Sequence, residues 1–342
     1  MKMNKTVLLT GITGFLGSHT AIHLLEQGYE VTGTMRNLKK ADHIKNVISK
    51  HTSHTDHLHF AEADLMDEDV WRTLMPGMDF VQHIASPFPQ VMPVDDDELI
   101  KPAKIGTLNV LRAASAHGVQ RVVLTSSIGA IIYGRKTNQK NNTYDESNWT
   151  NHQNKEDTNP YIRSKTIAEK AAWNYIAQDD SAMELVAVCP GTLLGPVLEK
   201  DIGTSVNIVV KLLDGSMPAL PKLGFEVVDV RSVANLLLRA MKRPEAANER
   251  FTGTAGFCTL HDMAKILQNK FADRKIPTRV LPNFIVRLFS YFDSSLKPVL
   301  MDLGAERKVD YTKARQQLDW KPRSKEEAVL TCAKSLIKLE LV

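Results

Sequence analysis

TGITGFLG, residues 10–17, carries a glycine at every third position from Gly11 to Gly17. The apolar residues Thr6–Leu9 before this segment predict a strand, and the apolar periodicity of Phe15–Gln27 after it predicts a helix. Between a strand and a helix, such glycines allow a tight turn, a close approach of the backbone to a pyrophosphate, and close packing of the helix on the strand. Free N–H groups at the helix start attract phosphate. The segment therefore predicts a dinucleotide-binding turn.

Strands and helices alternate from this turn to Pro190. Further strands are predicted at Tyr29–Met35, Leu58–Ala63, Asp79–Ile84, Val119–Ser126 and Leu185–Cys189. Further helices are predicted at Asp67–Met75, Ile105–His117 and Tyr161–Gln178. Strands separated by helices are typical of a parallel sheet, and right-handed crossovers place helices on both of its faces. We therefore expect an α/β fold with a Rossmann-type, doubly wound parallel sheet.

The pattern changes after Pro190. Glycine and proline crowd the next segment, at Gly191, Gly195, Pro196, Gly215, Pro218, Pro221 and Gly224. This crowding predicts a smaller, irregular lobe. We therefore expect a dinucleotide-binding domain at 1–190 and a substrate-binding lobe at 191–342. Within that lobe, 225–257 is expected to pack back on the first domain through a helix at Val228–Lys242.

The composition excludes several classes of protein. The chain has 342 residues, of which 43% are hydrophobic and 24% charged, as in ordinary globular proteins. A net charge of +4, spread along the chain, is too weak to indicate a nucleic-acid partner. The three cysteines are far apart and offer no disulfide framework, which favours a reduced, cytoplasmic setting. No apolar signal-peptide core and no membrane span are predicted.

The end of the second predicted strand bears on the choice of cofactor. NAD sites normally place an Asp or Glu there to hold the ribose 2′-hydroxyl, but this strand ends Thr34-Met35-Arg36. A guanidinium can bind a 2′-phosphate with two hydrogen bonds. We therefore expect NADP(H), with Arg36 as the main contact and Lys40 as a second; the alternative is that Arg36 is only a surface charge. Asp64 and Leu65 are expected to border the adenine, unless Asp64 is a helix cap.

Tyr161 and Lys165 are candidate catalytic residues. They lie four positions apart on a predicted helix and so share one face. A lysine ammonium there is expected to lower the pKa of the phenol from about 10, which would let Tyr161 exchange a proton near neutral pH. The strand before this helix ends in Ser126-Ser127, at the sheet edge where ligands bind in such folds. We choose Ser127 to bind the substrate oxygen, with Ser126 as the alternative.

Several segments together resemble the extended short-chain dehydrogenase/reductase family, in the branch of dihydroflavonol, cinnamoyl-CoA and related aldehyde reductases. They are TGITGFLGSH (Thr10–His19), GYEVTGTMR (Gly28–Arg36), HIASPF (His83–Phe88), IGTLNVLRAA (Ile105–Ala114), RVVLTSSIGA (Arg121–Ala130), PYIRSKTIAEKAAW (Pro160–Trp173) and CPGTLLGP (Cys189–Pro196). The resemblance covers most of the first two hundred residues and is loose in the final third.

The resemblance implies a catalytic triad of Ser127, Tyr161 and Lys165. It also implies that Phe15 and Leu16 lie over the pyrophosphate turn, that Ala85 lies near the cofactor, and that Pro190–Thr192 borders the nicotinamide. The full set of expected cofactor contacts is Gly11, Thr13, Gly14, Phe15, Leu16, Gly17, Arg36, Lys40, Asp64, Leu65, Ala85, Ser86, Tyr161, Lys165, Pro190, Gly191 and Thr192. Two positions depart from the family pattern. Lys104-Ile105 stands where many members have a catalytic Asn, and Ile132 stands where flavonoid reductases have a polar residue.

We therefore expect an NADPH-dependent oxidoreductase that reduces a small aldehyde or ketone to the alcohol, with Tyr161 as proton donor. The alternatives are a nucleotide-sugar epimerase or dehydratase with bound NAD, a hydroxysteroid-type dehydrogenase, and a non-catalytic NADP-binding regulator. The expected partner is a small carbonyl substrate rather than nucleic acid or membrane, and the expected state is a monomer or homodimer.

Four other features invite a functional interpretation. The histidines His51, His54, His57 and His59 are expected to be solvent-exposed rather than to bind a metal. Cys189 is expected to be a buried structural thiol. The apolar segment Phe284–Phe292 is expected to form a core or pocket-lining helix, and the polar segment Asn138–Asn154 an exposed loop.

Overall fold

The computed structural model describes residues 5–87, 93, 95–136, 142–291 and 300–342. Its largest element is a seven-stranded sheet in the order β10-β7-β5-β4-β1-β2-β3, in which every neighbouring pair is parallel. The strands are β1 (Thr6–Thr10), β2 (Glu30–Met35), β3 (Leu58–Glu62), β4 (Phe80–His83), β5 (Arg121–Thr125), β7 (Glu184–Pro190) and β10 (Arg250–Gly253). This sheet confirms the predicted Rossmann-type α/β fold.

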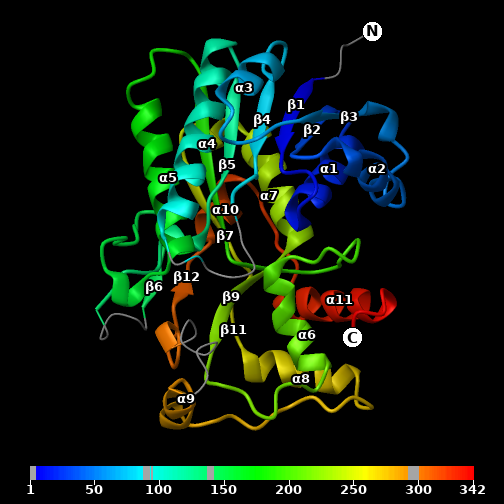
Figure 1. Ribbon diagram of the computed structural model, residues 1–342, viewed down its shortest axis with the longest axis vertical. Coiled ribbons are helices and arrows are strands. Elements are labelled where there is room, and N and C mark those ends of the chain that lie inside the picture. The colour runs from blue at the N-terminus through cyan, green and yellow to red at the C-terminus, as the bar shows by residue number, and fades with distance from the viewer. Residues whose placement is uncertain (1–4, 88–92, 94, 137–141, 292–299) are drawn as a thin grey trace.

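Helices cover both faces of the sheet (Figure 1). One face packs against α1 (Phe15–Glu26), α2 (Ala41–Ser49) and α7 (Val230–Lys242), and the other against α3 (Glu68–Leu74), α4 (Asp97–Ala116) and α5 (Pro160–Ile176). The strands are apolar on both sides because each face lies under helices. Helix α7 lies against α1, β5 and β7.

A second hydrophobic core lies below the sheet in Figure 1. It surrounds a three-stranded sheet of β8 (Thr192–Leu194), β9 (Gly224–Asp229) and β11 (Phe257–Thr259). The helices α6 (Asn207–Leu213), α8 (Leu260–Lys270), α9 (Asn283–Phe289) and α11 (Lys325–Lys338) contribute residues to this core. Most of the glycines and prolines of this region lie in the connections between its elements, and Gly224 begins β9.

The remaining elements are short. The strands β6 (Thr143–Tyr144) and β12 (Lys308–Val309) pair in parallel. The other helix is α10 (Thr312–Gln317), and the 3-10 turns are η1 (Leu38–Lys40), η2 (Thr55–His57), η3 (Ile128–Ala130), η5 (Lys155–Asp157), η6 (Thr204–Val206) and η7 (Pro244–Ala246). None of the helices in the described ranges is both long and apolar enough to cross a bilayer.

Three predicted elements differ from the structure. Helix α4 begins at Asp97, whereas the sequence predicts a beginning at Ile105. The predicted beginning is too late because Pro102, a residue type that normally marks a helix boundary, lies inside the helix. The described part of Asn138–Asn154 is not wholly exposed, since Tyr144 and Thr150 are buried; residues 138–141 lie outside the described residues.

The third difference concerns Phe284–Phe292, the segment expected to form a core or pocket-lining helix. Of α9 only Val286 is buried, whereas Phe284 is 70% exposed and Leu288 57% exposed. Because a helix of seven residues buries one side only, its other apolar residues face outward. Phe292, the last residue of the predicted helix, lies outside the described residues.

Candidate active site

The glycine-rich turn between β1 and α1 requires its glycines for steric reasons. Gly11 has φ +74°, a left-handed conformation that disfavours other side chains. A Cβ on Gly17 would lie 2.1 Å from the Gly11 carbonyl oxygen, so that α1 could not pack this close to the turn. A Cβ on Gly11 would lie 3.0 Å from Cα of Ala85, in the segment that follows β4. The turn therefore brings β1, α1 and the end of β4 into close contact.

The N-terminus of α1 fits a pyrophosphate. Gly14 is the N-cap residue and supplies no side-chain cap, and the first turn of the helix holds no acidic residue. The N–H groups of Phe15, Leu16 and Gly17 belong to the first helical turn, where no carbonyl within the helix can accept them. They combine with the positive end of the helix dipole to form an anion site. Thr13 lies half-buried in the bend just before Gly14.

A buried hydrogen-bond chain fixes the segment after β4. The Thr10 hydroxyl oxygen accepts the backbone N–H groups of Ile84 and Ala85, both at 3.0 Å. Its proton is then directed to Nδ1 of His83, 2.9 Å away, which leaves Nε2 of His83 as the donor toward Thr107. Burial lowers the pKa of His83 to about 3, so the ring is neutral. Ala85 and Ser86 are therefore held beside the glycine turn.

The end of β2 carries the predicted NADP contacts. Arg36 is exposed there, and Lys40 forms an exposed ion pair with Asp201 at 3.7 Å. The Glu62 carboxylate, at the end of β3, accepts the Leu38 N–H at 3.1 Å. An acidic residue therefore does lie near this loop, but on the neighbouring strand, and it holds the backbone.

Asp64 and Leu65 follow β3 as expected. Asp64 is exposed and accepts the Met66 N–H, and the N-cap of α3 is instead Asp67. The Leu65 carbonyl accepts the side-chain amide of Asn109 at 3.1 Å. A Cβ on Gly106 would lie 2.7 Å from the Leu65 side chain. Helix α4 thus packs directly under this corner of the sheet.

Helix α5 presents the candidate catalytic residues. Asn159 caps its first turn by accepting the Ile162 N–H, and Pro160 occupies the first helical position. Tyr161 is half-buried and shares a side-chain hydrogen bond with Ser127. Burial raises the pKa of Tyr161 above its usual value, and the hydrogen bond with Ser127 acts in the opposite direction. The phenol is therefore protonated at neutral pH.

Lys165 lies one helical turn after Tyr161 and is buried. Its Nζ donates to the Thr125 carbonyl at 3.0 Å. Burial lowers the pKa of Lys165 to about 8, while Cys189 and Glu169 act to raise it. The expectation that Lys165 lowers the pKa of Tyr161 is wrong for this structure, because the ammonium is bonded to the strand and desolvation of the phenol is the larger effect.

The two candidate serines make different contacts. The Ser126 hydroxyl donates to Glu169 at 2.6 Å, and Ser126 is buried. The Ser127 side chain accepts the Gly129 N–H at 3.0 Å, as the cap of η3, and meets Tyr161. The geometry therefore favours Ser127 over Ser126 as the residue beside Tyr161.

The segment after β7 lies between the two sheets. The Gly191 N–H donates to the Gly253 carbonyl at 3.0 Å, and a Cβ on Gly191 would lie 2.5 Å from the Glu226 carbonyl oxygen. Pro190 ends β7 and Thr192 begins β8. This strand-to-strand connection joins the large sheet to the smaller core at the same edge as Ser127.

The other features singled out in the sequence lie elsewhere. His57 and His59 both bond to Glu30, at 2.6 and 3.3 Å. The described residues contain no cluster of three or more His, Cys, Asp or Glu side chains placed to hold a metal ion. Cys189 is buried, as predicted, and its burial raises the pKa of the thiol.

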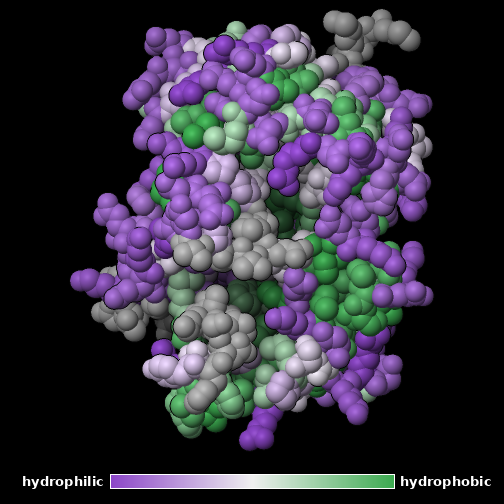
Figure 2. Space-filling view, in the orientation of Figure 1, coloured by the Kyte–Doolittle hydropathy of each residue, from purple (hydrophilic) through white to green (hydrophobic). Residues whose placement is uncertain are grey.

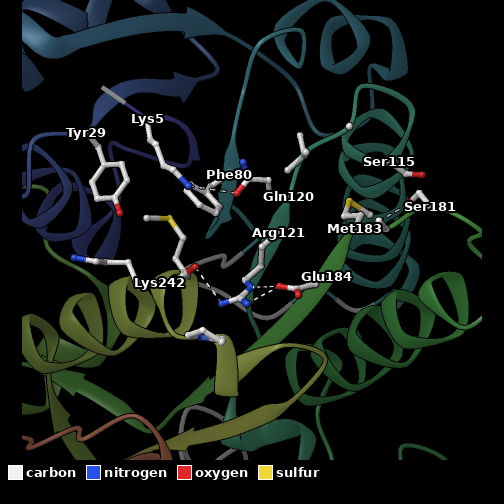
Figure 3. Close-up of a pocket in the computed structure, with 15 residues that line it drawn as sticks. Lys5, Tyr29, Phe80, Ser115, Gln120, Arg121, Ser181, Met183, Glu184 and Lys242 are labelled. Carbon is white, nitrogen blue, oxygen red and sulfur yellow. Dashed lines mark hydrogen bonds and ion pairs between the residues drawn. The ribbon is translucent and has the colours of Figure 1, made fainter. Parts of the chain in front are cut away.

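Two cavities in the described structure lie away from this site. A cavity of about 710 Å³ lies at the amino ends of β1, β4, β5 and β7 (Figure 3). A second, of about 600 Å³, lies between α1 and α7 and is lined by His19, His23 and Arg231. Figure 2 shows a hollow near the middle of one face, between the two halves of the molecule.

Sequence reasoning missed two residues that support the site, Glu169 and Arg250. Arg250 Nε donates to Glu169 at 2.5 Å and its terminal nitrogen donates at 3.1 Å, and both side chains are buried. Glu169 continues the four-residue spacing of Tyr161 and Lys165 along α5, which is the signal that could have identified it. Arg250 has no such local signal because it lies on a distant strand.

Comparison with known proteins identifies relatives over most of the chain. Residues 7–252 match the family described as NAD dependent epimerase/dehydratase. Cinnamoyl-CoA reductase 1 of Petunia hybrida is 33% identical over 305 residues, which cover 88% of this chain and 87% of that protein. Anthocyanidin reductase of Vitis vinifera is 31% identical over 293 residues, covering 80% of this chain and 83% of that protein.

Solved structures resemble the whole molecule. Yeast methylglyoxal/isovaleraldehyde reductase Gre2, in complex with NADPH, superimposes with a TM-score of 0.80 at 26% identity and covers 98% of this chain and 99% of its own. Gre2 from Candida albicans, also with NADPH, gives a TM-score of 0.78 at 27% identity, with 98% and 99% coverage.

Proposed function

The chain belongs to the NAD dependent epimerase/dehydratase family of extended short-chain dehydrogenases/reductases, and on that premise we propose that it is an NADPH-dependent reductase of small aldehydes or ketones. The observation that carries this proposal is the hydrogen bond between Ser127 and Tyr161, with Lys165 one helical turn away and bonded to the carbonyl of Thr125, the last residue of β5. The glycine turn after β1 opens at the same edge of the sheet, where open α/β folds bind their ligands.

The residues of the turn fit a dinucleotide. Gly11, Gly14 and Gly17 leave room for a pyrophosphate against uncapped N–H groups of α1, and Arg36 offers a cation for a 2′-phosphate. The two Gre2 relatives bind NADPH. Asp64, Leu65, Ala85, Ser86 and the 190–192 segment would border the rest of the cofactor. When bound, the reduced nicotinamide would supply the hydride.

The protein's own residues would manage the proton and the developing charge. Ser127 and Tyr161 would hold the carbonyl oxygen of the substrate between their hydroxyls. As the carbonyl carbon gains hydride, Tyr161 would give its proton to that oxygen, forming the alcohol and a phenolate. The raised pKa of Tyr161 suits a donor that must stay protonated. The Lys165 ammonium, one helical turn away, would then stabilise the phenolate.

Loss of the phenol tests this assignment. General acid catalysis contributes about 100- to 10,000-fold, so Tyr161→Phe should lower kcat by about that factor. Binding of NADPH should stay nearly unchanged, because the hydroxyl faces the substrate oxygen. Tyr291→Phe removes a hydroxyl from a side chain that is 85% exposed and serves as the matched control. Near-normal turnover of Tyr161→Phe would remove the mechanism.

The substrate class is tested by consumption of NADPH. Purified protein should oxidise NADPH, and NADH more slowly, in the presence of some members of a panel of aldehydes, diketones, ketoesters, flavanonols and cinnamoyl-CoA. Tightly bound NAD in the purified protein, with no oxidation of NADPH, would instead favour a nucleotide-sugar epimerase. NADPH binding without turnover on any carbonyl would favour a regulator.

A further inference from the structure

We propose that Glu169, held by Arg250, is a positioning residue that sets both the place and the charge of Lys165. The catalytic meaning of this inference rests on the reductase proposed above. The contacts and the charge that carry it do not depend on which substrate the protein takes.

Three consecutive residues at the end of β5 meet three residues of α5 spaced by one helical turn. Thr125 accepts Lys165 through its carbonyl, at 3.0 Å. Ser126 donates to Glu169 at 2.6 Å. The third contact joins Ser127 to Tyr161. Glu169 thus makes one of the three contacts that hold the end of β5 against α5.

Glu169 is fixed in turn by a rigid partner. It is 1% exposed, and it accepts Nε and a terminal nitrogen of Arg250, at 2.5 and 3.1 Å, and the indole N–H of Trp173 at 3.2 Å. The Arg250 guanidinium also donates to the carbonyls of Glu146 and Asn148. It stacks 3.7 Å from the centre of the Trp149 ring. A carboxylate held this firmly keeps its place when the cofactor or substrate changes.

The charge of Glu169 acts on Lys165. Lys165 bonds to the Thr125 carbonyl of β5 and interacts electrostatically with His83 of β4, Cys189 of β7 and Glu169 of its own helix. Tyr161 lies one helical turn before it. His83 is neutral because its pKa is about 3, and burial keeps the Cys189 thiol and the Tyr161 phenol protonated. Among these groups Glu169 supplies the negative charge, and Arg250 behind it supplies an opposing positive charge.

The test reads the pKa of Lys165 directly, in the full-length protein without substrate. Lysine labelled with carbon-13 at the ε position is titrated by NMR, and the Lys165 signal is assigned with Lys165→Arg. Glu169→Gln should move this pKa down by about one unit, and Arg250→Gln should move it up by about as much. Two variants that only disturbed packing would not shift it in opposite directions.

Controls separate charge from folding. Glu184→Gln removes a carboxylate from another arginine pair, Arg121–Glu184, at the other end of β5 and β7, and should leave the titration unchanged. The double variant Glu169→Gln/Arg250→Gln removes both charges and should return the pKa to near its original value. If either single variant fails to fold by circular dichroism, Ser126→Ala keeps both charges and should lower kcat several-fold with the Lys165 titration unchanged.

The outcomes for this inference and for the proposed function differ. Opposite shifts in a protein that reduces no carbonyl would support the role of Glu169 and reject the reductase. Carbonyl reduction with no shift in either variant, or with shifts of the same sign, would overturn the role of Glu169 and leave the reductase standing. In an active enzyme, the alkaline limb of the kcat/KM profile should move with the pKa of Lys165.

Discussion

Two arginine–glutamate pairs, each with a buried arginine, lie on opposite sides of the same sheet and have different surroundings. Arg121, at the start of β5, bonds to Glu184 (Figure 3). It also donates to the carbonyls of Ala240, Met241 and Arg243, at the end of α7. The Glu184 side chain is 36% exposed. Arg250 bonds to Glu169, whose side chain is fully buried and joins the end of β5 to α5.

The two pairs have different roles: Arg121–Glu184 holds a helix end, and Arg250–Glu169 lies beside the candidate site. At the amino end of the strands, Arg121 donates to carbonyls at the end of α7 that have no partner within the helix, and its partner Glu184 can also bind water. Near the carboxyl end of the strands, the Glu169 carboxylate needs its partner Arg250, because Glu169 has no access to water. The same pair of residue types therefore caps a helix in one place and supports the candidate catalytic lysine in the other.

The largest expected difference between the pairs is in stability. Arg250→Met leaves the Glu169 carboxylate buried without its partner and should lower the free energy of unfolding by about 3–5 kcal/mol. Arg121→Met loses hydrogen bonds to α7 while Glu184 stays solvated, and should cost about 1–3 kcal/mol. Urea unfolding of both variants measures the two losses. Equal losses would contradict the distinction between the pairs.

A smaller effect is expected at Glu226, a buried acid that accepts the Val309 N–H at 2.9 Å rather than an arginine. Burial raises the pKa of Glu226 to about 7. Because the pKa is raised in the folded state, the protein should lose stability as pH rises from about 4.5 through 7. Glu226→Gln should remove that loss and raise the free energy of unfolding at pH 8 by about 1–3 kcal/mol.

Unfolding measured at pH 5 and at pH 8 tests the Glu226 prediction. The gain should be confined to the higher pH, where the native side chain is ionised. A gain of the same size at both values would mean that the substitution acts through packing instead.

The smallest effect is expected at Arg36, an arginine that the structure leaves exposed at the end of β2. Arg36→Ser should reduce the preference for NADPH over NADH about tenfold, as expected for the loss of a charge-assisted hydrogen bond to a 2′-phosphate. The dissociation constants of both nucleotides measure it. Arg315→Ser removes an equally exposed charge elsewhere and should change neither constant. An unchanged preference in Arg36→Ser would show that the guanidinium is a surface charge.

The sheet could be predicted from the sequence because its signals are local. The strand, the glycine turn and the helix that open the chain lie within about twenty residues, and their spacing alone predicts the turn at Gly11. The beginning of α4 could not be predicted in this way, because Pro102 lies inside the helix and a proline normally indicates a helix boundary. A smaller lobe after Pro190 was predicted, but the packing of its core around β9 was not, because that core joins segments separated by more than a hundred residues.

In the candidate site too, local patterns could be predicted from the sequence and distant contacts could not. Tyr161 and Lys165 are visible as a pair on one helix face, and their roles stay predictions. The contact between Arg250 and Glu169 spans 81 positions of sequence, so no local pattern indicates it. The direction of the Tyr161 pKa depends on burial, which the spacing of residues does not encode.

The pairing of Thr125, Ser126 and Ser127 with three residues of α5 spaced by one helical turn has a consequence for how this protein can change over time. A substitution at one of these positions weakens one contact. An insertion or deletion between Thr125 and Gly129 would instead shift the residues of this segment out of register with α5 and disrupt the contacts together. We therefore expect lineages and laboratory selections to keep the length of this segment constant while tolerating altered side chains within it. Length variation should accumulate instead in surface connections of the second core, where no comparable alignment must be preserved.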